Sequence, residues 1–233
     1  MTSEVFSKTI KDYDLIIFDC DGTLVNSELL ANTVSANLMN DLGLNEYTPH
    51  NFMEEFMGQT WTNIAQIIEK RHQIKLPDDI YEQYASTLNN LLLDNLEIVA
   101  GALELVEACN NTAKICVASN GQRSNVIKSL EIGHFKPHFF TEETIFTRIQ
   151  VAEGKPAPDL FFYAAEKMSV TPEKCLVLED STTGVQAAVA ADMDVIGVTA
   201  VSHQAEIQEK RLKKAGALAV FDQIIHIEEM LGL

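Results

Sequence analysis

The sequence predicts an α/β fold in which a parallel sheet core carries an inserted, all-helical domain. Short apolar runs rich in β-branched residues alternate with helical patterns along most of the chain, as in βαβ units. Between residues 29 and 93, apolar residues recur only at helical spacing, with no strand pattern among them. We therefore predict a Rossmann-like core from residues 1–28 and 96–233, and an inserted all-helical domain from residues 29–95.

Five short apolar runs are predicted to be buried strands of the sheet. The first, residues 14–19 (DLIIFD), ends abruptly in acid and glycine, which is typical of a fully buried strand. The others are residues 113–119, 175–178, 194–199 and 217–221. Helical patterns at residues 102–109, 160–168 and 185–191 separate the later runs, so the strands are expected to be parallel.

The inserted segment contains three series of apolar residues at helical spacing. They are Leu30, Val34, Leu38 and Leu42; Trp61, Ile64, Ile67 and Ile68; and Tyr81, Tyr84, Leu88 and Leu91. The hinges of this helical domain are expected near residues 26–29 and 93–101. The alternative is that the helices extend a single domain and form no separate one.

Composition and charge argue against several classes of partner. The net charge of −17 disfavours nucleic acid and an anionic membrane, because both need a basic surface. No stretch approaches the roughly 20 apolar residues of a membrane helix, and the N-terminus lacks a signal-peptide pattern. We expect a cytoplasmic protein that is a monomer or a weak dimer. The four cysteines have no CxxC spacing and are expected to be buried thiols.

Three polar motifs follow predicted strands, at the edge where open parallel sheets bind ligands, and a fourth, which contains Lys155, comes directly before a predicted helix. In chain order they are Asp19 and Asp21 in Asp-Cys-Asp-Gly-Thr, then Ser119-Asn120-Gly121, then Lys155 in Gly-Lys-Pro-Ala-Pro-Asp, then Glu179-Asp180. Carboxylates at two strand ends suit a hard cation such as Mg²⁺, and an Asp there can also act as a nucleophile. Each motif alone also fits an ordinary turn, loop or solvated lysine.

The ordered set Asp-x-Asp-Gly-Thr, Ser-Asn, Lys-Pro and Glu-Asp resembles the motifs of the haloacid dehalogenase (HAD) superfamily of phosphatases and phosphomutases. The resemblance extends from residue 14 to about residue 199. It implies that Asp19 attacks phosphorus and also binds Mg²⁺. It implies that Asp21 acts as general acid and base, with its main-chain carbonyl as a further metal ligand.

The resemblance also implies roles for the other motifs. Ser119 and the N–H group of Asn120 would hold phosphate oxygens, and Lys155 would bridge the nucleophile and the phosphate. Two carboxylates, those of Glu179 and Asp180, would complete the protein's share of the metal shell. Gly121 and Thr23 complete the expected substrate-binding set.

Three positions discriminate between activities of the superfamily. Members that cleave carbon–halogen bonds lack the second Asp, so Asp21 argues against dehalogenation. Phosphohexomutases typically carry a His on the first cap helix and an Arg in the cap loop, where this chain has Ala31 and Trp61. Trp61 itself either packs in the core or forms a substrate platform.

The resemblance therefore implies a HAD-like phosphoric monoester hydrolase of the small helical-cap branch, with Mg²⁺ as cofactor. Its substrate would be a small phosphorylated metabolite of the sugar phosphate, phosphogluconate or phosphoglycolate type. A β-phosphoglucomutase-like phosphohexomutase is the first alternative. A non-enzymatic phosphate-binding module on the same fold is the second.

Overall fold

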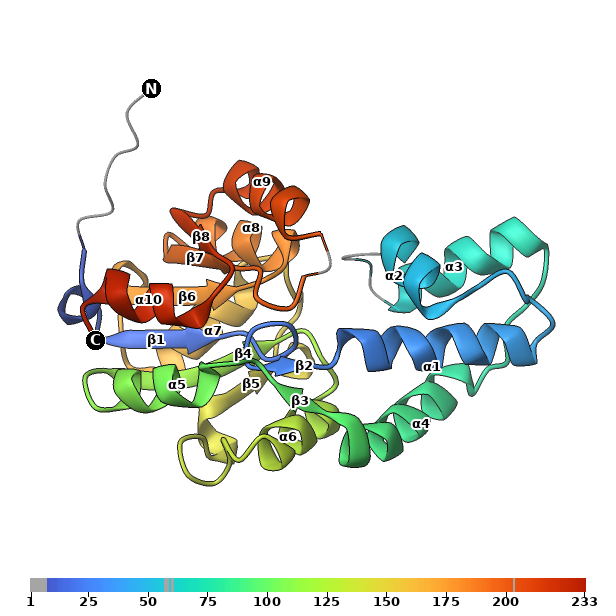
Figure 1. Ribbon diagram of the computed structural model, residues 1–233, viewed down its shortest axis with the longest axis horizontal. Coiled ribbons are helices and arrows are strands. Elements are labelled where there is room, and N and C mark those ends of the chain that lie inside the picture. Colours follow the sequence, from blue (N-terminus) through green and yellow to red (C-terminus); the bar gives the residue numbers. More distant parts are fainter. Residues whose placement is uncertain (1–7, 57–58, 60, 203) are drawn as a thin grey trace. The chain divides into compact units, whose positions relative to one another are not determined.

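The structure is a computed structural model that describes residues 8–56, 59, 61–202 and 204–233 (Figure 1). Contacts between Cα atoms divide the chain into two compact units, Met1–Asn26 with Glu97–Leu233, and Ser27–Leu96. The predicted boundaries, after residues 28 and 95, are close to these two divisions. That the two units are separate domains stays a prediction. The parts of the predicted core at residues 1–7 and of the predicted cap loop at residues 57, 58 and 60 lie outside the described residues.

A parallel sheet forms the centre of the first unit and confirms the predicted α/β fold class. In the described residues its strand order is β5-β4-β1-β6-β7-β8. The strands are β5 (Ile145–Thr147), β4 (Lys114–Ser119), β1 (Leu15–Phe18), β6 (Cys175–Glu179), β7 (Asp194–Val198) and β8 (Ala219–Phe221). Every neighbouring pair runs parallel. Because β1 lies between β4 and β6, the carboxyl ends of these three strands meet in the middle of one sheet edge.

Helices cover both faces of this sheet. They are α5 (Ala102–Asn110), α6 (Arg123–Ile132), α7 (Asp159–Met168), α8 (Thr182–Ala190), α9 (Ala205–Ala215) and α10 (Ile224–Leu231). Leu15 and Ile17 of β1 belong to a core cluster that includes side chains of α7, α8 and α9. Successive side chains of a strand point to opposite faces, and the Phe18 ring lies 6.2 Å from that of Phe140 on the other face. Burial on both faces explains why the sequence of β1 is uniformly apolar.

Three short strands do not follow from the sequence pattern. One is β5, at the edge of the sheet. The others are β2 (Val25–Asn26) and β3 (Glu97–Ile98), which pair antiparallel where the chain leaves the first unit and returns to it. Val25 is paired with Ile98, and the N–H group of Val99 donates to the carbonyl of Leu24 at 3.0 Å. With two residues each, β2 and β3 are too short to show a periodic pattern.

The second unit is helical in its described residues. Its helices are α1 (Glu28–Asp41), α2 (Pro49–Phe56), α3 (Trp61–His72) and α4 (Ile80–Asn95). Met39, Phe52 and Ile68 lie in its buried apolar cluster. Trp61 is partly buried against this cluster, and its ring stacks on that of Tyr84 with centroids 4.7 Å apart. Trp61 therefore contributes to packing inside the helical unit, as the first of its two interpretations predicts.

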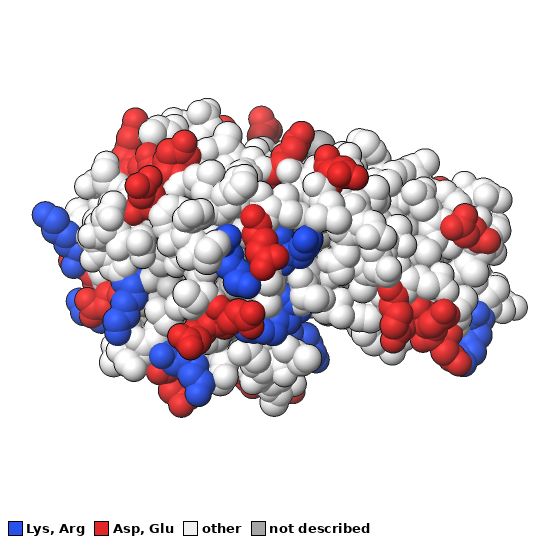
Figure 2. Space-filling view, turned by 90° about the horizontal axis from the view of Figure 1, so that it is seen from below, with Lys and Arg blue, Asp and Glu red and all other residues white. Residues whose placement is uncertain are grey.

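The remaining composition-based expectations concern thiols, membranes and charge. All four cysteines are buried free thiols, and burial raises the pKa of Cys109 and Cys175 to about 12 each. Among the described residues, every helix is too short or too polar to cross a bilayer. On the face in Figure 2, acidic side chains occur in several separate groups, with basic ones between some of them. A site for an anion in a chain of net charge −17 must therefore rest on local positive groups.

Candidate active site

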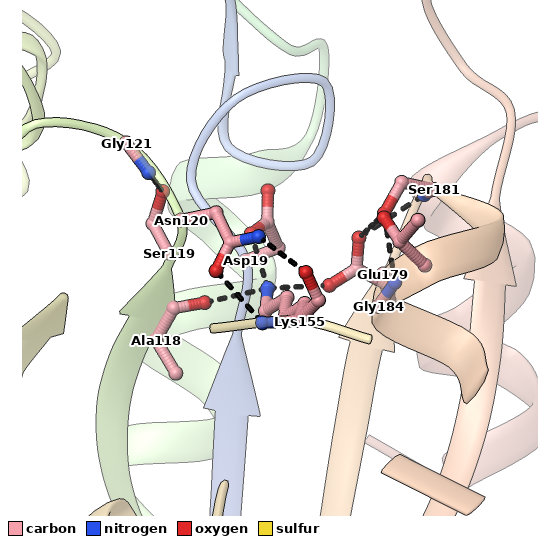
Figure 3. A network of polar contacts seen from close by, with 10 residues as sticks. Asp19, Ala118, Ser119, Asn120, Gly121, Lys155, Glu179, Ser181 and Gly184 are labelled. Carbon is pink, nitrogen blue, oxygen red and sulfur yellow. Dashed lines mark hydrogen bonds and ion pairs between the residues drawn. The ribbon is translucent and has the colours of Figure 1, made fainter. Parts of the chain in front are cut away.

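Six of the predicted site residues lie together at the carboxyl edge of the sheet in Figure 3, namely Asp19, Ser119, Asn120, Gly121, Lys155 and Glu179. Asp19 follows β1, Ser119 ends β4 and Glu179 ends β6. The N–H group of Asp19 still donates to the carbonyl of Leu178 at 2.9 Å, so the sheet register holds up to the carboxylate. Lys155 enters from the loop before α7. All six residues belong to the same compact unit, so the distances between their side chains are defined within that unit.

Lys155 lies at the centre of the site and is 5% exposed. Its ammonium donates to Oδ1 of Asp19 at 2.6 Å, to Oε2 of Glu179 at 2.7 Å and to the carbonyl of Ala118 at 2.8 Å. An ammonium has three N–H donors, so all three are engaged by the protein. Burial alone would lower the pKa of Lys155, but Asp19 and Glu179 together raise it above its ordinary value.

Asp19 is buried beside other acidic groups. Burial and the neighbouring Glu179 carboxylate raise its pKa, Lys155 lowers it, and the net effect is a pKa of about 8. One buried lysine thus leaves negative charge in excess around Asp19. The carboxylates of Asp19, Glu179 and Asp180 can each offer an oxygen, and these oxygens lie within 4.8 Å of one another. An all-oxygen, anionic donor set fits a hard divalent cation such as Mg²⁺.

Gly22 brings the first motif against the Asp180 carboxylate. Its φ is +89°, in the left-handed region that favours glycine. A Cβ atom at this position would lie 2.1 Å from Oδ2 of Asp180. The turn after β1 therefore requires glycine for two independent reasons, and Asp180 packs directly on that turn.

Glu179 is held by the start of α8. Its Oε1 accepts from the N–H group of Ser181 at 3.0 Å and from the Ser181 hydroxyl at 2.6 Å. The same hydroxyl accepts from the N–H group of Gly184 at 3.0 Å, as an N-cap residue does. A carboxylate oxygen has two lone pairs, so Ser181 occupies both of those on Oε1, while Oε2 accepts from Lys155 and keeps one lone pair for a metal ion.

A second group of polar atoms surrounds Gly121. The Gly121 N–H group donates to Oγ of Ser119 at 3.0 Å. A Cβ atom on Gly121 would lie 3.1 Å from that Oγ atom and 3.2 Å from Oδ2 of Asp21, so both side chains face the same small space. Thr23 is 1% exposed, and its buried Oγ1 has no hydrogen-bond partner among the described residues. A buried hydroxyl without a partner is unusual in a folded protein, so Thr23 stays a candidate for contact with a ligand.

Asn120, predicted to bind substrate through its N–H group, uses its side chain differently. The amide forms two hydrogen bonds with the main chain of Lys155, each 2.9 Å long. The sequence gives no indication of this contact, which joins residues 35 positions apart.

Two further side chains at the site are missing from the predicted set. Ser181 orients Glu179 and is the N-cap of α8, which begins three residues before the helical pattern predicted at residues 185–191. Gln208 of α9 donates from Nε2 to the main-chain carbonyl of Asp180 at 2.7 Å. No local pattern could have identified Gln208, because it lies 28 residues further along the chain.

Comparison with known proteins places this geometry in a family. The sequence profile described as haloacid dehalogenase-like hydrolase matches residues 16–198, which is most of the chain. This protein belongs to the haloacid dehalogenase-like hydrolases. The motifs at the ends of β1, β4 and β6 all lie within the matched region or at its edge, so the superfamily predicted from them is confirmed.

Relatives and solved structures agree with this assignment. The chain is 30% identical to 6-phosphogluconate phosphatase of Escherichia coli K12, covering 83% of this chain and 86% of that protein. It is 29% identical to a fructose-1-phosphate phosphatase of the same organism, covering 80% and 96%. A haloacid dehalogenase-like protein from Agrobacterium tumefaciens has a TM-score of 0.81 at 31% identity, covering 94% and 98%. The enzyme class predicted for this HAD-like chain, phosphoric monoester hydrolase, is confirmed by this family and these phosphatase relatives.

Proposed function

We propose that this protein is a Mg²⁺-dependent phosphatase that hydrolyses a small sugar phosphate or a related phosphorylated metabolite through an aspartyl-phosphate on Asp19. The observation that carries the proposal is the buried Asp19 carboxylate, which is held by Lys155 and forms a group of three carboxylates with Glu179 and Asp180. The relatives named as 6-phosphogluconate and fructose-1-phosphate phosphatases support a sugar phosphate type of substrate.

The reaction takes place in two steps at this sheet edge. In the first, the Asp19 carboxylate attacks phosphorus, the bond from phosphorus to the ester oxygen breaks, and Asp21 gives a proton to the leaving oxygen. In the second, Asp21 takes a proton from water, which attacks phosphorus and releases Asp19 and inorganic phosphate. Ser119, the N–H groups at Asn120 and Gly121, and the Thr23 hydroxyl are proposed to hold the phosphate oxygens.

Two cations are proposed to neutralise the negative charge of the carboxylates and the bound phosphate, namely Mg²⁺ and the Lys155 ammonium. Mg²⁺, held by Asp19, Glu179, Asp180 and the Asp21 main-chain carbonyl, would offset the charge of the phosphate and of the carboxylates. Lys155 holds Asp19 in place and offsets part of its charge. Because all three of its donors already have protein acceptors, we assign Lys155 to the nucleophile first. A bond to phosphate would require it to release one of these acceptors.

A turnover screen against some tens of phosphorylated metabolites with Mg²⁺ tests this function. We expect release of inorganic phosphate from sugar phosphates. β-Glucose 1-phosphate with a catalytic amount of hexose bisphosphate should be hydrolysed and not isomerised, because Ala31 and Trp61 occupy the positions of the mutase His and Arg. Isomerisation would establish the mutase alternative, and no turnover of any phosphoester would favour the binding module.

Three further expectations stay predictions: that the helical unit is a cap, that the protein is cytoplasmic, and that it is a monomer or a weak dimer.

Replacement of Gly22 by Ala tests the metal site from the protein side. A methyl group 2.1 Å from Oδ2 of Asp180 must displace that carboxylate. We expect the Mg²⁺ concentration for half-maximal activity to rise at least about tenfold, and left-handed backbone strain to lower the free energy of unfolding by about 1–2 kcal/mol.

Gly43→Ala is the matched control for this variant. Gly43 has a φ of +86°, but a Cβ atom there would meet nothing within 4 Å. Gly43→Ala should lower the midpoint of thermal unfolding, because of the backbone strain, and should leave the Mg²⁺ concentration for half-maximal activity unchanged. Equal Mg²⁺ requirements in both variants would contradict the role of Asp180.

A further inference from the structure

The side chain of Asn120 is bound to both polar groups of the Lys155 main chain. Nδ2 of Asn120 donates to the carbonyl of Lys155, and Oδ1 accepts from its N–H group, each at 2.9 Å (Figure 3). Two opposed hydrogen bonds fix the orientation of an amide as well as its position. The loop after β4 and the loop before α7 are therefore joined at this one residue.

Gly154 leaves room for the Asn120 amide. A Cβ atom on Gly154 would lie 2.5 Å from Oδ1 of Asn120 and 2.7 Å from Cγ of Arg148. Arg148 is exposed and can move aside, whereas Asn120 is held at both ends of its amide. A side chain at position 154 would thus act mainly on the contact between Asn120 and Lys155.

Residues at the end of β4 contact both the main chain and the ammonium of Lys155. Asn120 binds the main chain, and the carbonyl of Ala118, two residues earlier, accepts from the ammonium at 2.8 Å. Between these points the buried side chain passes the ring of Phe161, with Nζ 5.1 Å from the ring centroid. The ammonium reaches Asp19 and Glu179 from a main chain that cannot shift without breaking two hydrogen bonds.

We propose that Asn120 is a positioning residue whose side-chain amide, acting through the Lys155 main chain, sets where the Lys155 ammonium meets Asp19. The proposal rests on the function proposed above and adds a side-chain role to the main-chain role expected of Asn120. An error of about 1 Å in such a placement costs about 100-fold in rate. Loss of the amide therefore acts on the chemical step more than on substrate binding.

Steady-state kinetics of Asn120→Ala and Asn120→Asp with p-nitrophenyl phosphate and Mg²⁺ test the proposal. We expect kcat to fall about 10- to 100-fold while KM changes less than about threefold. Asn120→Asp should be at least as impaired, because a carboxylate oxygen then faces the Lys155 carbonyl. Asn125→Ala, in α6, is the matched control and should stay within about twofold of the wild type. An unchanged kcat, or a raised KM at unchanged kcat, would overturn the proposal.

The space at Gly154 provides a coupled test. Gly154→Ala alone should reproduce the loss of kcat seen in Asn120→Ala. In the Asn120→Ala background it should cost less than about a further twofold, because the amide that it displaces is absent. Fully additive losses would mean that Gly154 acts through another contact and would overturn this part of the proposal.

A crystal structure of Asn120→Ala gives a readout that does not depend on activity. We expect Nζ of Lys155 to lose at least one of its three acceptors, and retention of all three would overturn the proposal. If the wild-type protein turns over no phosphomonoester, the proposed function fails, while this structure still decides the role of Asn120.

Discussion

Asp19→Asn is expected to lower kcat for phosphate release by at least about 10⁴-fold, because an amide oxygen cannot form the aspartyl-phosphate. The replacement keeps the size of the side chain, so the site should keep its shape. Asp21→Asn retains the nucleophile and loses only the acid–base group, so it should lose about 10²–10⁴-fold. Steady-state assays of phosphate release with Mg²⁺ compare the two, and acid-quenched wild-type enzyme should carry phosphate that Asp19→Asn lacks.

The charges around Asp19 predict that this inactive variant still folds. Lys155 contacts two carboxylates, so Asp19→Asn leaves it paired with Glu179 and removes one of several mutually repelling charges. Its thermal unfolding should therefore resemble that of the wild type. Asp14→Asn, at the exposed amino end of the same strand, is the control and should keep full activity. Activity of Asp19→Asn close to the wild type would exclude Asp19 as the nucleophile.

The central strand of the sheet was the most readily predicted from the sequence. The run that forms β1 is apolar throughout because both faces of this central strand are covered. β8 has three residues but lies within the predicted run at residues 217–221, whereas β5, with three residues, and β2 and β3, with two each, lie in no such run. Their positions depend on neighbours far along the chain.

In the helical unit, the sequence pattern did not predict the start of α2, and the apolar series predicted for α1 extended one residue too far. The start of α2 is marked by reciprocal bonds between Thr48 and Asn51 and by Pro49 at the first helical position, which a search for helix starts could have found. Leu42 continues the apolar series of α1 but is 39% exposed. The helix ends at Asp41, and Gly43 with its positive φ turns the chain away.

The convergence of the motifs at one sheet edge was predictable from the sequence, whereas the contacts among their side chains were not. Strand ends of a parallel sheet share one edge, so the order of the motifs already indicates that Asp19, Ser119 and Glu179 meet. The sequence could not indicate that the Lys155 ammonium has all its donors engaged, or that the Asn120 amide faces the Lys155 main chain. Both facts depend on side-chain orientation across loops that are distant in sequence.

Lys155→Met is expected to abolish most activity and, without Mg²⁺, to lower the free energy of unfolding by about 3–5 kcal/mol, because it leaves buried carboxylates without their cation. Chemical denaturation at pH 7 measures this loss. Lys210→Met, on the exposed surface of α9, should change the free energy of unfolding by less than about 0.5 kcal/mol. Mg²⁺ should restore part of the stability of Lys155→Met, because it supplies positive charge to the same carboxylates.

The pH dependence of that loss separates a charge effect from a packing effect. Burial and Glu179 raise the pKa of Asp19 from 3.8 to about 8, so over this range the folded protein holds a proton that the unfolded chain has released. The metal-free protein should therefore lose stability as pH rises from about 4 to 8. Without Lys155 the negative charge has less compensation, so the deficit of Lys155→Met should be larger at pH 8 than at pH 5. A deficit independent of pH would mean that Lys155 stabilises the site by packing alone, and the electrostatic role assigned to it would be wrong.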